Sequence, residues 1–208
     1  YSNLPSVEFS CPDFLTLDGF DTSDPLYSQQ YQLSRINASP AWNISTGSES
    51  IVVAVVDEGV DTGHEDLAAN VVDGYDVYGD DDNPTPANDD AHATACAGII
   101  GASTNNSLGM AGVMWNLSML PIRIGAGGSF YSQDAADGIS WAASNGADVI
   151  SWSWGGGPPY QPLTDAVNSA ATQGRNGLGC IVVFAAGNSG GGVSYPAYLE
   201  NSIAVGAT

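Results

Sequence analysis

Basic side chains are almost absent from this sequence. Its 208 residues contain no lysine and only three arginines, Arg35, Arg123 and Arg175, against 23 aspartates and glutamates, which gives a formal net charge of −20. Proteins that bind nucleic acids neutralise phosphates with clustered cations, and three scattered arginines form no such cluster. The composition therefore argues against nucleic acid and against an anionic membrane surface as partners.

Long hydrophobic runs are missing as well. No apolar stretch approaches the ~18 residues that span a bilayer, and no basic, apolar and small-residue succession marks a signal peptide. The hydrophobic fraction is 43%, which is sufficient for one domain with a sizeable core. Because the chain opens at Tyr1 rather than Met, we expect a processed or trimmed product.

Cysteine and histidine are scarce and widely spaced. Cys11, Cys96 and Cys180 form no CxxC pair and lie far in sequence from His64 and His92, so we do not expect a zinc site. An odd number of thiols leaves at least one free, or paired with a segment outside this chain. The apolar run around Cys96 favours a small buried hydrophobe, and the polar turn around His64 favours a structural histidine.

Strand and helix patterns alternate along most of the chain. Residues 1–27 are polar and show no period, which indicates an N-terminal arm before a domain at 28–208. Strands are expected at 51–56, 119–124, 149–153, 181–185 and 202–205, and helices at 133–144 and 163–173, the first with Ser132 as N-cap and Gly146 just past its end. This order predicts an α/β fold with a mostly parallel central sheet and helices on both faces.

Polar residues follow three of the predicted strands. In open parallel sheets, ligands bind beyond the carboxyl ends of the strands, and those ends are Asp57, residues 153–155 and residues 187–188. An aspartate in such a place is either a turn former or a carboxylate that a polar partner uses. His92 opens a helix of small residues, which would pack closely on the sheet and hold the imidazole at its edge.

Four blocks of this sequence resemble the subtilisin-like serine proteases. In the family's order and spacing, they resemble its aspartate block (53–67), its histidine block (92–98), the strand that lines its substrate cleft (151–155) and its oxyanion block (184–190). The resemblance implies a three-layer subtilisin-like fold. Residues 28–208 would be the N-terminal two-thirds of the catalytic domain, with the C-terminal part missing.

The resemblance assigns catalytic roles to Asp57, His92 and Asn188. In this family the aspartate holds the imidazole tautomer, the histidine takes the nucleophile's proton, and the asparagine amide helps to stabilise the oxyanion. The substrate-binding residues that it implies are Ser153, Trp154, Gly155, Ala186 and Gly187. The implied function is a serine endopeptidase that hydrolyses peptide bonds in polypeptides.

The family's nucleophile motif, a Gly-Thr-Ser-Met-Ala-like helix start, does not occur before Thr208. We expect the catalytic serine on a segment absent from this chain, such as its own C-terminal fragment. The apolar strand near the end of the chain favours this interpretation. The alternative is an inactive pseudoprotease that acts as a calcium-stabilised binding or regulatory module.

Two positions depart from the family pattern. Ala93 replaces a usual Gly, and its methyl group would either crowd the site or fit a right-handed helix. Glu58 follows Asp57 where Ser, Thr or Asp is usual, and it would either contact a basic substrate residue or be one more exposed carboxylate. Some segments are similar to the kexin-like branch, but residues 155–159 and 192–196 lack that branch's pocket acids, so we expect a neutral or apolar preference before the cut.

Loop carboxylates and carbonyls offer the oxygen ligands that Ca²⁺ prefers. The loop at 103–110 resembles the family's strong calcium loop, and the ligands that this resemblance implies are Asp24, Asp66, Asn106 and the carbonyls of Ser103, Leu108 and Met110. The alternative is an ordinary Asn-rich turn. Asp76, Asp80 and Asp82 resemble a second calcium loop of the thermitase branch. The family resemblance and the calcium demand together imply a secreted protein.

A dinucleotide-binding module is a further alternative, because Gly125 and Gly127 follow a predicted strand. The third glycine of that motif is replaced by Phe130, and no acidic residue ends the following strand. This interpretation is therefore rejected.

Overall fold

The computed structural model describes residues 20–87 and 90–207. Cys11 and most of the expected N-terminal arm lie outside these residues. A six-stranded sheet with the order β2-β3-β1-β6-β7-β8 runs through the molecule, and all its neighbouring strands are parallel. Its strands are β1 (Gly47–Asp57), β2 (Tyr75–Asp76), β3 (Asn116–Arg123), β6 (Val149–Trp152), β7 (Ile181–Ala185) and β8 (Ile203–Val205).

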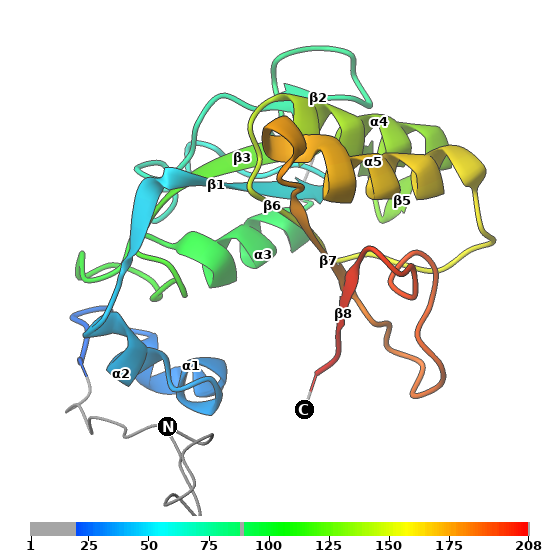
Figure 1. The fold of residues 1–208 in the computed structure, drawn as a ribbon. Coiled ribbons are helices and arrows are strands. Elements are labelled where there is room, and N and C mark those ends of the chain that lie inside the picture. The colour runs from blue at the N-terminus through cyan, green and yellow to red at the C-terminus, as the bar shows by residue number, and fades with distance from the viewer. Residues whose placement is uncertain (1–19, 88–89, 208) are drawn as a thin grey trace, which may run out of the picture.

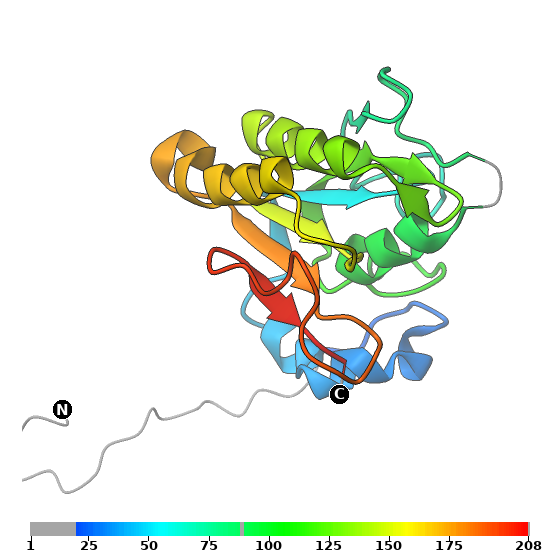
Figure 2. The ribbon, with the colours of Figure 1, turned by 90° about the vertical axis from the view of Figure 1, so that its right-hand side faces the viewer.

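Helices cover both faces of this sheet (Figure 1). On one face lie α4 (Ser132–Ser144) and α5 (Gln161–Gly177), and on the other lies α3 (His92–Gly101). Figures 1 and 2 place the short elements η1 (Tyr27–Gln29), α1 (Tyr31–Arg35) and α2 (Ala38–Trp42) beyond α3, on its side of the sheet. A hairpin of β4 (Gly125–Ala126) and β5 (Ser129–Phe130) follows β3. The predicted three-layer α/β fold is confirmed.

The apolar run of β1 is continuous because this strand is buried on both faces. Side chains alternate between the two faces of a strand, so Ala54 and Val56 pack in the core beneath α4 and α5, while Val53 and Val55 pack in the core against α3. All four are at most 4% exposed. A strand in the middle of a parallel sheet is buried on both faces, and polar residues would be costly on either one.

Helix α4 approaches the sheet closely because glycine stands where it crosses the strands. A Cβ atom on Gly138 would lie 2.6 Å from Cγ2 of Ile124 and 3.4 Å from Cγ1 of Val56. The next residue, Ile139, and Ala142 one turn along are fully buried in the same core. Small residues on this face of α4 therefore set the distance between the helix and the sheet.

The ends of two helices differ from the sequence prediction. Ser132 is the first residue of α4 rather than its N-cap, which is Tyr131 and makes no side-chain capping bond. Gly146 does follow the end of α4 in a left-handed conformation, with φ of 90°, as predicted. Helix α5 begins at Gln161, before the predicted start at Leu163, and although its assigned range runs to Gly177, the backbone angles of residues 174–176 are not helical, so its regular part ends at Gln173 as predicted.

The segment before β1 is anchored by aromatic packing. The rings of Trp42 and Trp115 meet edge to face at 5.3 Å, and the Trp42 indole Nε1 donates to the carbonyl of Val113 at 2.9 Å. Leu33 and Ala38 are buried in the same small core. Within the described part of the chain, no helix is both long and apolar enough to cross a membrane.

The α4 core contact predicts a large stability difference between two substitutions on one helix. Ile139→Ala should lower the free energy of unfolding by about 2–5 kcal/mol, because it leaves a cavity between α4 and the sheet. Ser144→Ala, at an exposed position of the same helix, should change it by less than about 0.5 kcal/mol. Urea denaturation followed by tryptophan fluorescence measures both values. Equal effects would contradict the packing described here.

Candidate active site

Three neighbouring strands end at the same edge of the sheet and bring the predicted catalytic residues to it. Strand β1 ends at Asp57, and β6 and β7 end at Trp152 and Ala185. These strands are parallel and adjacent in the order β1-β6-β7, so the segments that follow them meet. The structure thus places Asp57, residues 153–155 and residues 187–188 as the strand-end argument predicted.

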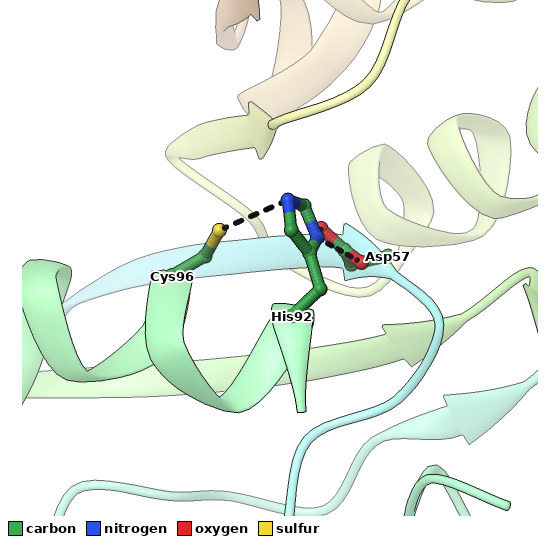
Figure 3. A group of neighbouring side chains, drawn as sticks. All are labelled: Asp57, His92 and Cys96. Carbon is green, nitrogen blue, oxygen red and sulfur yellow. Dashed lines mark hydrogen bonds and ion pairs between the residues drawn. The ribbon is translucent and has the colours of Figure 1, made fainter. Parts of the chain in front are cut away.

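The Asp57 carboxylate is buried and orients His92. Both of its oxygens lie 3.0 Å from Nδ1 of His92, and the carboxylate belongs to β1 while the imidazole stands on the first residue of α3 (Figure 3). Asp57 is 1% exposed, and its Oδ1 also accepts from Nε1 of Trp154 and from the backbone N–H of Glu58, each at 2.8 Å. Because an ionised carboxylate only accepts hydrogen bonds, Nδ1 is the donor, and in the neutral imidazole Nε2 then carries the lone pair.

Cys96 lies next to Nε2 of His92, a contact that was not predicted from the sequence. Its Sγ is 4.0 Å from Nε2 of His92 (Figure 3), and the residue is half-buried rather than a buried hydrophobe. The two residues are four apart on α3, a spacing that places side chains on one helix face and could have revealed this contact. Burial raises the pKa of the Cys96 thiol, so the thiol is protonated at neutral pH.

Ligand atoms of Asp57, His92 and Cys96 lie within 4.8 Å of one another, a spacing that could hold a metal ion. In the described residues this is the sole group of three or more His, Cys, Asp or Glu side chains with that spacing. Cys96 and Cys180 are both free thiols. The Sγ of Cys180 is buried and donates to the carbonyl of Ala147 at 3.0 Å, which is a structural contact.

A cleft of about 470 Å³ opens beside His92. Asn188 and four of the five predicted substrate-binding residues line it, namely Ser153, Trp154, Gly155 and Gly187. Ala186, the fifth, is not among the lining residues, and its backbone is occupied by hydrogen bonds with Val205 and Ser194. Glu58, which follows Asp57 directly, also lines the cleft.

Glycine is required at position 187, immediately before Asn188. Its φ is 105°, a left-handed conformation that L side chains rarely adopt. A Cβ atom there would also lie 2.6 Å from Oγ of Ser194. This turn presents the exposed Asn188 at the cleft.

The alternatives for Ala93 are resolved by its position in α3. The residue is helical and fully buried, and its methyl group packs in the core against β1 with Val53 and Val55. It therefore fits a right-handed helix and does not line the cleft. His64 remains a structural residue: its Nδ1 accepts from the backbone N–H of Asp66 at 3.2 Å in an exposed turn.

The first predicted calcium loop brings two buried carboxylates to one asparagine. Asp24 is 4% and Asp66 3% exposed. The backbone N–H of Asn106 donates to Asp24 at 3.0 Å, and its side-chain amide donates to Asp66 at 2.8 Å. Ser103, Leu108 and Met110 lie on the same loop, and the Met110 N–H donates to Asp66 at 2.9 Å. No ion pair between described residues neutralises either carboxylate.

The residues of the second predicted calcium loop do not converge. Asp76 pairs with Arg123, with Oδ2 at 2.5 Å from Nη1, while Asp80 accepts from the hydroxyl of Tyr75 at 2.7 Å. Asp82 lines a separate surface cavity. An arginine already compensates the one buried carboxylate of the three, so these contacts do not support a calcium ion there.

Comparison with known proteins places the chain in a family. The model of the Subtilase family matches residues 48–208. Thermitase of Thermoactinomyces vulgaris is 43% identical over 91% of this chain and 66% of its own length. A thermophilic serine proteinase of a Bacillus species is 39% identical over 99% of this chain and 50% of its own length.

A solved structure agrees with the observed fold. A protease of Pseudoalteromonas arctica superposes with a TM-score of 0.70 and 33% identity, over 80% of this chain and 59% of its own. The chain thus spans between half and two-thirds of the length of these three relatives. With 161 of its residues matched by the family model, the chain belongs to the subtilase family, the subtilisin-like serine proteases.

Proposed function

We propose that this chain is part of a serine endopeptidase that hydrolyses peptide bonds in polypeptides. Asp57, His92 and Asn188 supply three of its catalytic groups, and the nucleophilic serine comes from a segment absent from this chain. One observation carries the proposal: Asp57 binds Nδ1 of His92 at the sheet edge, while His92 lines the same cleft as Asn188. Relatives named as a thermophilic serine proteinase and as a calcium-dependent protease support it.

The geometry suits His92 to act as a general base and then as a general acid. Its Nε2 takes the proton from the serine hydroxyl as the serine oxygen attacks the carbonyl carbon, and later gives that proton to the leaving amine. Asp57 stabilises the imidazolium that forms between these steps. The Asn188 amide donates to the oxygen that becomes negative in the tetrahedral intermediate.

The cleft supports binding of an extended substrate with uncharged groups next to the reacting bond. Ser153, Trp154, Gly155 and Gly187 line it and carry no charge. We assign them to substrate binding, and we assign Ala186 to support of the turn that carries Asn188. This lining favours a neutral or apolar residue immediately before the cut.

We also propose that Asp24, Asp66 and Asn106 bind Ca²⁺, together with the carbonyls of Ser103, Leu108 and Met110. Two buried carboxylates without a cationic partner among the described residues fit a divalent ion that prefers oxygen ligands. Relatives from Nostoc and Trichormus variabilis are named calcium-dependent proteases. Bound calcium would join the segment at residue 24 to the loop after α3.

A secreted location is part of this proposal. A 41% identical relative of Natrialba magadii is named an extracellular serine protease. The excess of carboxylates over basic groups would keep such a protein soluble through self-repulsion.

A fluorophosphonate probe tests the proposed activity directly. When the natural protein that contains this chain is labelled and its intact masses are measured, we expect one adduct on the segment that carries the serine. His92→Ala should abolish the labelling, because the serine then has no base to take its proton. No adduct on any segment of the intact natural protein would favour the inactive pseudoprotease.

Asn188→Ala should lower kcat by about 10²–10³-fold and change KM much less, because the amide acts mainly on charge that forms in the transition state. Asn201→Ala is the matched control, since Asn201 is an exposed asparagine outside the cleft. Steady-state kinetics on one peptide substrate measures both. A kcat for Asn188→Ala within threefold of the unmodified protein would remove Asn188 from the catalytic groups.

Removal of Ca²⁺ should lower the melting temperature of this chain by roughly 5–10 °C, as expected when an ion at about 100 times its Kd is lost. Asp66→Asn should have a lower melting temperature that no longer responds to a chelator. Glu49→Gln, which removes one exposed carboxylate of β1, should respond as the unmodified chain does. Thermal unfolding with and without EGTA measures these shifts. An unchanged transition of the unmodified chain in excess chelator would refute the site.

A further inference from the structure

Glu58 is a buried carboxylate with little to compensate its charge. It is 6% exposed, and its Oε2 accepts one hydrogen bond, at 2.8 Å, from the backbone N–H of Gly128 in the β4–β5 hairpin. The ion pairs between described residues join Asp57, Asp76 and Asp148 to His92, Arg123 and Arg175, and Glu58 takes part in none of them. An ionised carboxylate removed from water is costly unless a cation or several donors contact it.

This carboxylate belongs to the cleft that contains the catalytic groups. Glu58 lines it together with His92 and Asn188, and it is the one acidic side chain among the described lining residues. The carboxylate of Asp57, its neighbour in sequence, already has three donors. The expectation that Glu58 is one more exposed carboxylate is therefore wrong, and its alternative, contact with a basic substrate residue, gains physical support.

We propose that Glu58 determines specificity by selecting a lysine or arginine side chain of the substrate at a position close to the bond that is cut. This inference rests on the proposed endopeptidase function. The incoming ammonium or guanidinium group would pair with a carboxylate that the protein has already desolvated, so the pairing would be stronger than at the surface. The uncharged remainder of the lining would accept neutral residues at the other positions.

Glu58 could instead serve only to hold the β4–β5 turn. A comparison with Asp90, which holds the same turn, distinguishes this structural role from a role in substrate selection. Asp90 holds the same hairpin turn, because its Oδ2 accepts from the backbone N–H of Gly127 at 2.9 Å. Asp90 lines a different cavity, beside α3, and not the cleft of His92. The two carboxylates thus support adjacent glycines of one turn, but only Glu58 lies where a substrate would bind.

The test uses the natural protein that contains this chain and its catalytic serine. Peptide substrates carry lysine, in turn, at each of the four positions before the cut, and each is paired with a peptide carrying norleucine, which has a similar length and no charge. We expect a preference for lysine of about 10- to 100-fold in kcat/KM at one position, as a hydrogen-bonded charge pair supplies. Glu58→Gln keeps an oxygen for the Gly128 N–H and should reduce that ratio to near one.

Asp90→Asn is the matched control, because it removes a carboxylate from the same turn and should preserve the lysine-to-norleucine ratio. Peptides that are cut with no lysine preference, or with a preference that survives Glu58→Gln, overturn the inference and leave the proposed function standing. An equal loss of the lysine-to-norleucine ratio in Glu58→Gln and Asp90→Asn also overturns the inference, because disruption of the turn would then explain the loss. Absence of both cleavage and fluorophosphonate labelling would refute function and inference together.

Discussion

The buried carboxylate of Asp57 is the constraint on which the site depends. It is 1% exposed and takes its hydrogen bonds from His92 on α3, from Trp154 after β6 and from the backbone N–H that follows it. An ionised carboxylate without these donors would cost several kcal/mol in such a place. The donors meet only if β1 lies between β3 and β6 with α3 packed beneath it. The arrangement of strands and helix that satisfies the Asp57 carboxylate is therefore the same one that orients the imidazole of His92.

The buried acidic residues of the described chain divide by how their charge is compensated. N–H donors surround Asp57, and an arginine pairs with Asp76. Asp24 and Asp66 are equally buried but contact neutral amides alone, which is the situation that a bound cation relieves. Glu58 resembles these last two in burial but lies in the cleft, so its cation would arrive with a substrate. Buried carboxylates that no cationic side chain contacts are thus the places where this protein would bind a cation.

Sequence patterns predicted the sheet better than the details of the site. Runs of β-branched residues identify strands because both faces of β1 are buried, and strand ends then locate Asp57 and Asn188. The resemblance that made Asp76 a calcium ligand did not include its pairing with Arg123, which joins segments 47 residues apart in sequence, and the second calcium site stays a prediction. The prediction of Ser132 as the N-cap of α4 was wrong. A serine at the N-cap and a serine in the first helical turn cannot be distinguished from the sequence without backbone angles. Contacts between distant segments leave no local signature.

Cys96 shows how the surroundings of His92 would keep it available as the proposed base. A thiolate 4.0 Å from Nε2 of His92 would stabilise the protonated imidazole, and a protonated imidazole cannot accept the nucleophile's proton. Burial opposes this outcome, because it raises the pKa of the Cys96 thiol and holds the sulfur neutral. The carboxylate of Asp57 lies on the opposite nitrogen, where negative charge orients the ring and stabilises the imidazolium only as it forms. Of the two groups that contact the ring, the charged one thus lies at Nδ1 and the neutral one at Nε2, the nitrogen that would exchange protons under the proposed function.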